Sequence, residues 1–218
     1  MASTTAGANP DGAGASVFAP VLDVARAIGG ASDRWAVHGG WALDLAAGTR
    51  SRHHEDVDVT VDATDASSVL DALARHGAEV AWVIAEGDRL AQAPRRPAEP
   101  RPAGAHQARV RLGGVRVDVV LEPWAPGAWR YRRDPRIGLP LERAVRHLAV
   151  EGVALPVLAP EAVLLVKAGR DGWATPRSKD DADLALALPS LDAQTRAWLR
   201  DALPAGHPWR ARLAPATL

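Results

Sequence analysis

A Gly-Gly pair followed at a short distance by two closely spaced carboxylates is the feature of this 218-residue chain that most restricts its fold. The glycines are Gly39 and Gly40, and the sequence after them predicts a helix over residues 41–47. Asp56 and Asp58 then lie at the start of a β-branched run. Because the first N–H groups of a helix are free and favour anions, this glycine pair predicts a phosphate site. A tight strand-to-helix turn is the alternative for the glycines taken alone.

Asp56 and Asp58 fall on one face of a predicted strand over residues 57–61. Alternate residues of a strand share a face and lie roughly 6.6 Å apart, at about 3.3 Å per residue. The two carboxylates therefore project side by side, while Val57 and Val59 pack into the core. Such a pair suits Mg²⁺, a hard cation that takes oxygen ligands, including substrate phosphates. A solvated strand face is the alternative, but together with the glycines the pair indicates a metal-bound nucleoside triphosphate and nucleotidyl transfer.

A third carboxylate, Asp118, lies in a predicted hairpin over residues 109–121. Gly113-Gly114 between two alternating runs is a two-residue turn signal. The valines at alternate positions after the turn form one apolar face, and Asp118 points the other way. A carboxylate within a valine-rich strand carries a desolvation cost unless something pairs with it, and a metal ion would do so.

These segments resemble the DNA polymerase β-type nucleotidyltransferase superfamily, specifically the branch that holds aminoglycoside 2″-adenylyltransferases and lincosamide nucleotidyltransferases. The resemblance covers most of residues 17–212. It rests on an ordered set of motifs, which are residues 39–61 with Arg52 and His54 shortly before Asp56, then Asp118, residues 158–167, Lys179-Asp180-Asp181-Ala182-Asp183 and His207-Pro208-Trp209. It implies an enzyme, an adenylyltransferase with ATP as donor, Mg²⁺ as cofactor and a small hydroxyl-bearing acceptor of aminoglycoside or lincosamide type.

The resemblance also implies roles for individual residues. Asp56 and Asp58 would bind Mg²⁺, and Asp118 would complete the metal site, act as general base toward the acceptor hydroxyl, or both. Lys167 would neutralise the leaving pyrophosphate. Arg52 and His54 would be either structural or close to the phosphates. The predicted nucleotide-binding residues are Gly39, Gly40, Arg52, His54, Lys167 and Lys179.

The two lysines stand out, because the other residues among the 26 Lys+Arg are all arginine. Lys167 and Lys179 therefore indicate positions that need a compact point charge, as a polyphosphate does. A surface lysine with its stem packed on apolar neighbours is the alternative for Lys167. Lys179 is expected at a helix start, where a cation opposes the helix dipole.

Two groups of residues are candidates for binding the acceptor. Trp124, Trp129 and Tyr131 follow the Asp118 strand and would line an acceptor pocket or stack on a base, with a lid or domain contact as the alternative. An acidic rim for a polycationic acceptor would consist of Asp171, Asp180, Asp181 and Asp183. The same four carboxylates would otherwise cap helices and face water.

The predicted fold is α/β (α+β), with two domains after a disordered tail over residues 1–16. Residues 17–125 would form a nucleotidyltransferase domain with a small mixed, mostly antiparallel sheet flanked by helices, and residues 126–218 a mainly helical domain that closes the cleft. The expected helices in the first domain cover residues 21–28, 41–47 and 68–76, and the expected strands cover residues 35–38, 57–61 and 79–84 and the hairpin. Three further helices are expected to begin at Pro160, at Ser178, which would form a capping box with Asp181, and after Asp192. Residues 92–105 are too rich in proline for a helix or a strand.

Composition adds a few restrictions. The chain has no cysteine, a formal net charge of +0 and neither a membrane-length apolar run nor a leader. We therefore expect a soluble, cytoplasmic monomer or homodimer with no membrane partner, and the neutral charge argues against nucleic acid. Two alternative functions remain. One is a toxin or regulatory nucleotidyltransferase that acts on tRNA or protein, and the other is a catalytically silent nucleotide-binding module.

Overall fold

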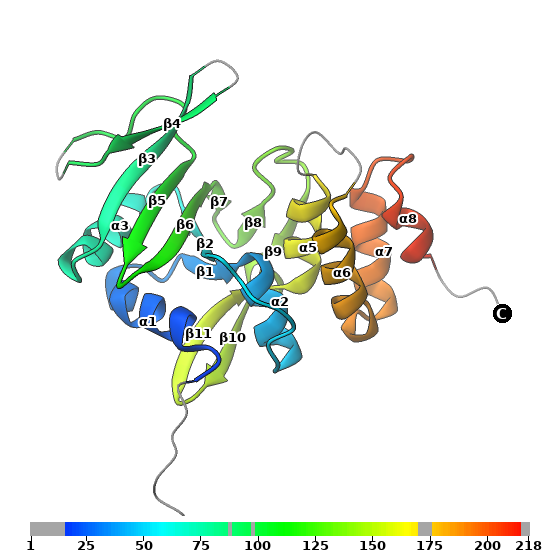
Figure 1. Cartoon of the computed structure of the whole chain (residues 1–218). Coiled ribbons are helices and arrows are strands. Elements are labelled where there is room, and N and C mark those ends of the chain that lie inside the picture. The colour runs from blue at the N-terminus through cyan, green and yellow to red at the C-terminus, as the bar shows by residue number, and fades with distance from the viewer. Residues whose placement is uncertain (1–15, 87–88, 97–98, 170–175, 215–218) are drawn as a thin grey trace, which may run out of the picture.

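A large mixed sheet flanked by helices makes up most of the protein, with a smaller sheet beside it (Figure 1). The computed structural model describes residues 16–86, 89–96, 99–169 and 176–214. The predicted mixed α/β class is confirmed, although the main sheet is larger than expected, with eight strands. Most of the predicted tail, residues 1–15, lies outside the described residues. Within the described parts, no helix is both long and apolar enough to span a membrane.

The strands of the large sheet run in the order β10-β11-β1-β2-β6-β5-β3-β4. Their bounds are β1 Trp35–His38, β2 Val57–Asp62, β3 Glu79–Glu86, β4 Arg89–Pro94, β5 Gln107–Leu112, β6 Val115–Glu122, β10 Val145–Val150 and β11 Val153–Leu158. Neighbours are antiparallel except for β1 with β11 and β2 with β6. The parallel pairing of β2 with β6 sets Asp58 directly opposite Asp118.

Two groups of helices stand out, α1 with α3 on one side of the molecule and α5, α6, α7 and α8 side by side at the other end (Figure 1). The helix bounds are α1 Ala19–Ile28, α2 Gly39–Ala47, α3 Ala66–Arg75, α4 Leu141–Ala144, α5 Pro160–Ala168, α6 Ser178–Ala187, α7 Ala193–Ala202 and α8 Trp209–Arg212. Helices α1 and α3 pack on each other and on β2, whereas α5 contacts α2, α6 and α7. The small sheet consists of β7 Trp124–Ala125, β8 Ala128–Arg130 and β9 Gly138–Pro140.

The alternation of residues in β2 decides which side chains reach the core. Val57, Val59 and Val61 are fully buried and belong to the same apolar core as α1 and α3. Because successive side chains of a strand point to opposite faces, Asp58 is directed to the other face of the sheet. The valines thereby hold the carboxylate strand in one register, since a slip of one residue would exchange the two faces.

Helix α2 follows β1 without a connecting loop. It begins at Gly39 rather than at Trp41 and ends at Ala47, and its C-cap is Gly48, whose φ of +69° lies in the left-handed region that glycine tolerates. His38, the last residue of β1, pairs with Asp58 in β2. The start of α2 is therefore held beside the carboxylate strand.

The segment that we predicted to be mainly helical, residues 126–218, contains four strands and the short helix α4 before its longer helices. β8 and β9 belong to the small sheet, and β10 and β11 extend the main sheet next to β1. The physical reason is a hairpin whose turn, Glu151-Gly152, has positive φ at both residues and joins two runs rich in Val, Leu and Ala. The helical part of the chain thus begins at Pro160.

Three local predictions have different outcomes. Residues 92–94, expected to be outside regular structure, form the end of β4, and Pro94 is accommodated because β4 is the edge strand of the sheet. Helix α6 begins at Ser178 as expected, but Arg177 occupies the N-cap position and no side-chain capping bond forms. Asp192 does cap α7, because its carboxylate accepts a hydrogen bond of 2.7 Å from the Thr195 N–H.

Candidate active site

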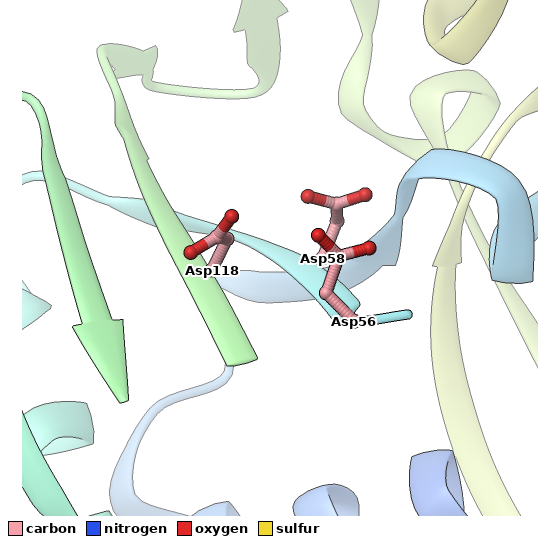
Figure 2. Close-up of side chains that lie close together, drawn as sticks. All are labelled: Asp56, Asp58 and Asp118. Carbon is pink, nitrogen blue, oxygen red and sulfur yellow. The ribbon is translucent and has the colours of Figure 1, made fainter. Parts of the chain in front are cut away.

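Three carboxylates gather where β2 and β6 lie side by side (Figure 2). Asp58 is in β2, Asp56 immediately precedes that strand, and Asp118 is opposite Asp58 in β6. One oxygen from each carboxylate lies within 4.8 Å of the others. Asp56 and Asp58 are partly buried and Asp118 is 8% exposed. Three converging carboxylate oxygens fit the ligand preference of a hard divalent cation such as Mg²⁺.

Two arginines that our sequence-based prediction did not include balance part of this negative charge. Arg109 Nε donates to Asp118 Oδ1 at 3.0 Å, and Arg116 forms an ion pair with Asp56. The hydrogen bond to Asp56 raises the pKa of Arg116. A signal for Arg109 was present in the sequence, because counting outward from a two-residue turn at the two glycines of the hairpin places residue 109 opposite residue 118.

The glycine pair is packed tightly against Asp58 and against the side chains of Arg52 and His54. Gly39 has a φ of +69°, and a Cβ at this position would collide with the Asp58 carboxylate. A Cβ at Gly40 would meet the side chains of His54 and Arg52. Only residues without a Cβ therefore let the start of α2 approach the carboxylate strand this closely.

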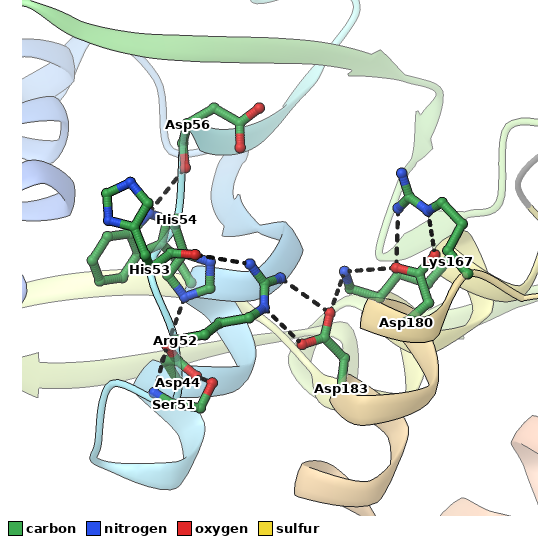
Figure 3. A network of polar contacts seen from close by, with 11 residues as sticks. Asp44, Ser51, Arg52, His53, His54, Asp56, Lys167, Asp180 and Asp183 are labelled. Carbon is green, nitrogen blue, oxygen red and sulfur yellow. Dashed lines mark hydrogen bonds and ion pairs between the residues drawn. The ribbon is translucent and has the colours of Figure 1, made fainter.

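A buried carboxylate in α2 anchors the loop that carries Arg52 and Asp56 (Figure 3). Asp44 is fully buried and accepts hydrogen bonds from the N–H and the hydroxyl of Ser51, at 3.0 and 2.5 Å. His54 Nε2 lies 2.6 Å from the same carboxylate. Trp41 Nε1 donates to the Asp56 carbonyl at 3.0 Å. This short loop is consequently fixed at several points to the helix before it.

His54 is part of this anchor. Its ring lies 4.5 Å from that of Trp41, between centroids, and its other contact is Asp44. Burial lowers the pKa of His54, and the charge of Arg52 acts in the same direction, against the hydrogen bond to Asp44 that raises it. These contacts support a structural role for His54 rather than one close to the phosphates, although the residue also lines the pocket described next.

A pocket lined by both acidic and basic residues opens beside the three carboxylates. Its lining includes Gly40, Arg52, His54, Asp56, Asp58, Arg116, Asp118, Lys167, Arg177 and Lys179. Lys167 is 6% exposed, and its Nζ lies 2.7 Å from Asp183 and 3.3 Å from Asp180 (Figure 3). Lys179 is exposed. Both lysines predicted from the sequence are therefore brought to the same pocket as the carboxylates.

A second pocket adjoins the first and shares Asp58, Asp118 and Lys167 with it. Its lining further includes His38, Gly39, Gln107, Val120, Glu122, Tyr131, Arg132, Arg133 and Val166. It extends from the carboxylates along β6 toward the small sheet. The two pockets are therefore adjacent and meet at these three shared residues.

Of the three aromatic residues that we predicted to line an acceptor pocket, Tyr131 lines the second pocket. Trp129 is fully buried, and its Nε1 donates to Glu122 Oε2 at 2.5 Å. Trp124 is 6% exposed and pairs with Trp129 across strands β7 and β8. The two tryptophans thus support the small sheet, and their rings are held away from the pocket by packing.

Glu122 is a buried carboxyl group on the floor of this second pocket. It also accepts a hydrogen bond of 2.9 Å from the Thr60 hydroxyl. Burial raises the pKa of Glu122, although the bonds from Trp129 and Thr60 oppose this shift. Glu122 was absent from our sequence-based candidates, and its position four residues after Asp118, on the same face of β6, is the signal that would have identified it.

The acidic rim expected for a polycationic acceptor does not form from the described residues. Asp180 and Asp183 are buried and bonded to cations of the first pocket. Asp181 accepts from Trp209 Nε1 at 2.6 Å and pairs with Arg212 at 3.2 Å. Asp171 lies outside the described residues.

Comparison with known proteins agrees with the geometry. A sequence profile of the aminoglycoside-2″-adenylyltransferase family matches residues 20–186. No curated protein sequence matches the chain. The solution structure of the antibiotic-resistance factor ANT(2″)-Ia is 19% identical, with a TM-score of 0.58, over 89% of this chain and 91% of that one. The crystal structure of ANT(2″)-Ia in complex with adenylyl-2″-tobramycin is 17% identical, with a TM-score of 0.57, over 89% and 97%.

A third structure is more distant. The lincomycin-bound lincosamide adenylyltransferase LnuA is 15% identical, with a TM-score of 0.46, over 70% of this chain and 84% of that one. The two structures of ANT(2″)-Ia show that the chain has a nucleotidyltransferase fold.

Proposed function

The chain belongs to the aminoglycoside-2″-adenylyltransferase family, and we propose that it transfers AMP from ATP, with Mg²⁺, to a hydroxyl group of a small molecule of aminoglycoside or lincosamide antibiotic type. The family consists of nucleotidyltransferases, so the reaction class follows from membership. The observation that carries the finer proposal is the convergence of three carboxylates beside a pocket lined with basic side chains. The carboxylates suit a divalent cation, and the basic side chains suit a polyphosphate.

Asp56, Asp58 and Asp118 would hold Mg²⁺, since their oxygens are close enough to share one site. The ion, when bound, would neutralise phosphate charge and polarise the phosphate oxygens. Asp118 would in addition accept the proton of the acceptor hydroxyl. Its hydrogen bond with Arg109 would orient the carboxylate for these roles.

The triphosphate would lie between the start of α2 and the basic side chains of the first pocket. Gly39 and Gly40 would offer backbone N–H groups to it, favoured by the helix dipole. Arg52, Lys167 and Lys179 would contact its oxygens, and Lys167 would stabilise the charge of the departing pyrophosphate. Catalysis would then consist mainly of positioning and charge stabilisation.

The acceptor would occupy the second pocket, next to Asp118 and Tyr131. The product named in the ANT(2″)-Ia complex, adenylyl-2″-tobramycin, is an adenylylated aminoglycoside, and LnuA is a lincosamide adenylyltransferase. These two acceptor classes are therefore the first to examine for this chain.

Glycine 39 provides a structural prediction with a matched control. We expect Gly48→Ala to lower the melting temperature by roughly 2–8 °C, because its φ of +69° lies in the left-handed region, which costs an L-residue about 1–2 kcal/mol. Gly39→Ala has the same φ but should lower the melting temperature further, because its Cβ would also collide with Asp58. Only Gly39→Ala should lose adenylyl transfer, because its Cβ displaces Asp58, whereas a Cβ at Gly48 meets nothing within 4 Å. Equal activity of the two folded variants would contradict the close approach.

The proposed function is tested by incubating the protein with ATP, Mg²⁺ and a panel of hydroxyl-bearing compounds, followed by mass spectrometry. The panel includes aminoglycosides, lincosamides, a tRNA and protein acceptors. We expect one small molecule to gain an adenylyl group in a Mg²⁺-dependent manner. An adenylylated tRNA or protein, with every small molecule unmodified, would show that the acceptor class is wrong.

A further inference from the structure

A carboxylate of α6 lies between the two most enclosed cations of the first pocket (Figure 3). Lys167 Nζ is 2.7 Å from Asp183 Oδ2. Arg52 approaches the same carboxylate with two nitrogens, Nη2 at 3.3 Å and Nε at 3.4 Å. The Asp183 side chain is 3% exposed, so water competes little for these bonds. Asp183 thus joins a helix near the C-terminus to the loop before β2 and to α5.

A neighbouring carboxylate repeats this arrangement. Asp180 lies 3.3 Å from Lys167 Nζ and accepts two hydrogen bonds from Arg177, at 2.7 and 3.0 Å. Burial acts to raise the pKa of Asp180, but the bonds from Arg177 and the charge of Lys167 outweigh it and lower the pKa. Three cations therefore surround two carboxylates, which leaves this cluster with a surplus of positive charge at the wall of the pocket.

We propose that Asp183 is a positioning residue for the triphosphate, which holds Lys167 and Arg52 directed toward the phosphate site before the nucleotide binds. This role rests on the proposed function, since it assigns both cations to the phosphates. Lysine and arginine have long, flexible side chains that lose rotamer freedom when they bind a ligand. A carboxylate that already fixes them reduces this entropic cost at the moment of binding.

The negative charge of Asp183, taken alone, would weaken the binding of the triphosphate, whereas the positioning role would strengthen it. Asp183→Asn removes a negative charge from the wall of an anion site, so a purely electrostatic role predicts tighter binding of Mg²⁺·ATP. A positioning role predicts weaker binding, because Lys167 and Arg52 lose their common partner. The direction of the change in affinity therefore separates the two explanations.

Isothermal titration calorimetry of Mg²⁺·ATP and of AMP with three proteins tests this role. We expect Asp183→Asn to raise the dissociation constant for Mg²⁺·ATP by roughly ten- to a hundredfold relative to the wild type. AMP, which lacks the outer phosphates, should bind almost as before. Asp181→Asn is the matched control, because Asp181 is on the same helix and loses the same charge but bonds to Trp209 and Arg212.

Three results would overturn the role of Asp183. They are unchanged or tighter binding of Mg²⁺·ATP, an equal loss for AMP and ATP, and an equal loss in Asp181→Asn. If Asp183→Asn does not fold, Asp183→Glu is measured in its place. This variant keeps the charge but displaces the carboxylate by one methylene, so weaker ATP binding is again expected and unchanged binding contradicts the role.

The same titrations separate this inference from the proposed function. A wild-type protein that binds no Mg²⁺·ATP would refute both. A wild-type protein that binds it, together with an unaffected Asp183→Asn variant, would refute the positioning role alone.

Discussion

Asp58→Asn should abolish adenylyl transfer while the protein stays folded. Asp58 is opposite Asp118 in the pairing of β2 with β6 and lies against the start of α2, so its loss removes a charged ligand from the proposed Mg²⁺ site. Because the metal ion supplies several kcal/mol of transition-state stabilisation, the rate should fall by roughly 10³-fold or more. Product formation followed by mass spectrometry, at saturating ATP and Mg²⁺, measures this loss.

The stability of this variant provides an internal check. Three carboxylates within 4.8 Å repel one another when no metal is bound, so Asp58→Asn without Mg²⁺ should have an unchanged or higher melting temperature. Asp23→Asn is a control for the change in net charge, because Asp23 lies far from the carboxylate group in sequence and its pair with Arg26 on α1 is exposed. Near-normal turnover by Asp58→Asn would contradict the metal assignment. Loss of turnover with a large drop in melting temperature would indicate a structural carboxylate.

Asp118→Asn should lower kcat by roughly 10²–10⁴ if the carboxylate is chiefly the general base. In that case the affinity for Mg²⁺·ATP should change little, because Asp56 and Asp58 still hold the ion. If Asp118 is chiefly a metal ligand, this affinity should fall as well. Measurement of kcat together with calorimetric titration of Mg²⁺·ATP distinguishes the two roles.

A third outcome for Asp118 concerns its bond with Arg109. The Arg109 side chain is 33% exposed, so water can replace the lost carboxylate and the melting temperature should change only slightly. A large decrease would show that the Arg109–Asp118 pair is needed for folding. Unchanged kcat, affinity and melting temperature together would remove Asp118 from the site altogether.

The parts of this site that could be predicted from sequence depend on local spacing. Asp56 and Asp58 share a face because strand side chains alternate, and the two-residue turn of the 109–121 hairpin fixes the register around Asp118. The side-by-side placement of Asp58 and Asp118 could not be predicted from local spacing, because it depends on the parallel pairing of β2 with β6. The resemblance to nucleotidyltransferases, rather than any spacing, supplied that step.

The parts that were missed depend on contacts between distant segments. Arg52 and Asp183 are 131 residues apart, and nothing in their local sequence indicates that they bond. The burial of Trp129 was missed for another reason. It follows from the small sheet, whose strands are too short to show an alternation of polar and apolar residues. The hairpin of β10 and β11 did have a local signal, the Glu151-Gly152 turn between two apolar runs, which the prediction overlooked.

The transfer of label from ATP labelled at the α-phosphate tests the central claim most directly. The protein is incubated with Mg²⁺ and the acceptor found in the panel, in parallel with ATP labelled at the γ-phosphate. We predict that the α-label appears on the acceptor with the wild-type protein and not with Asp58→Asn, while the γ-label appears in pyrophosphate. Transfer of the γ-label to the acceptor, or Mg²⁺-independent transfer of the α-label, would contradict the account.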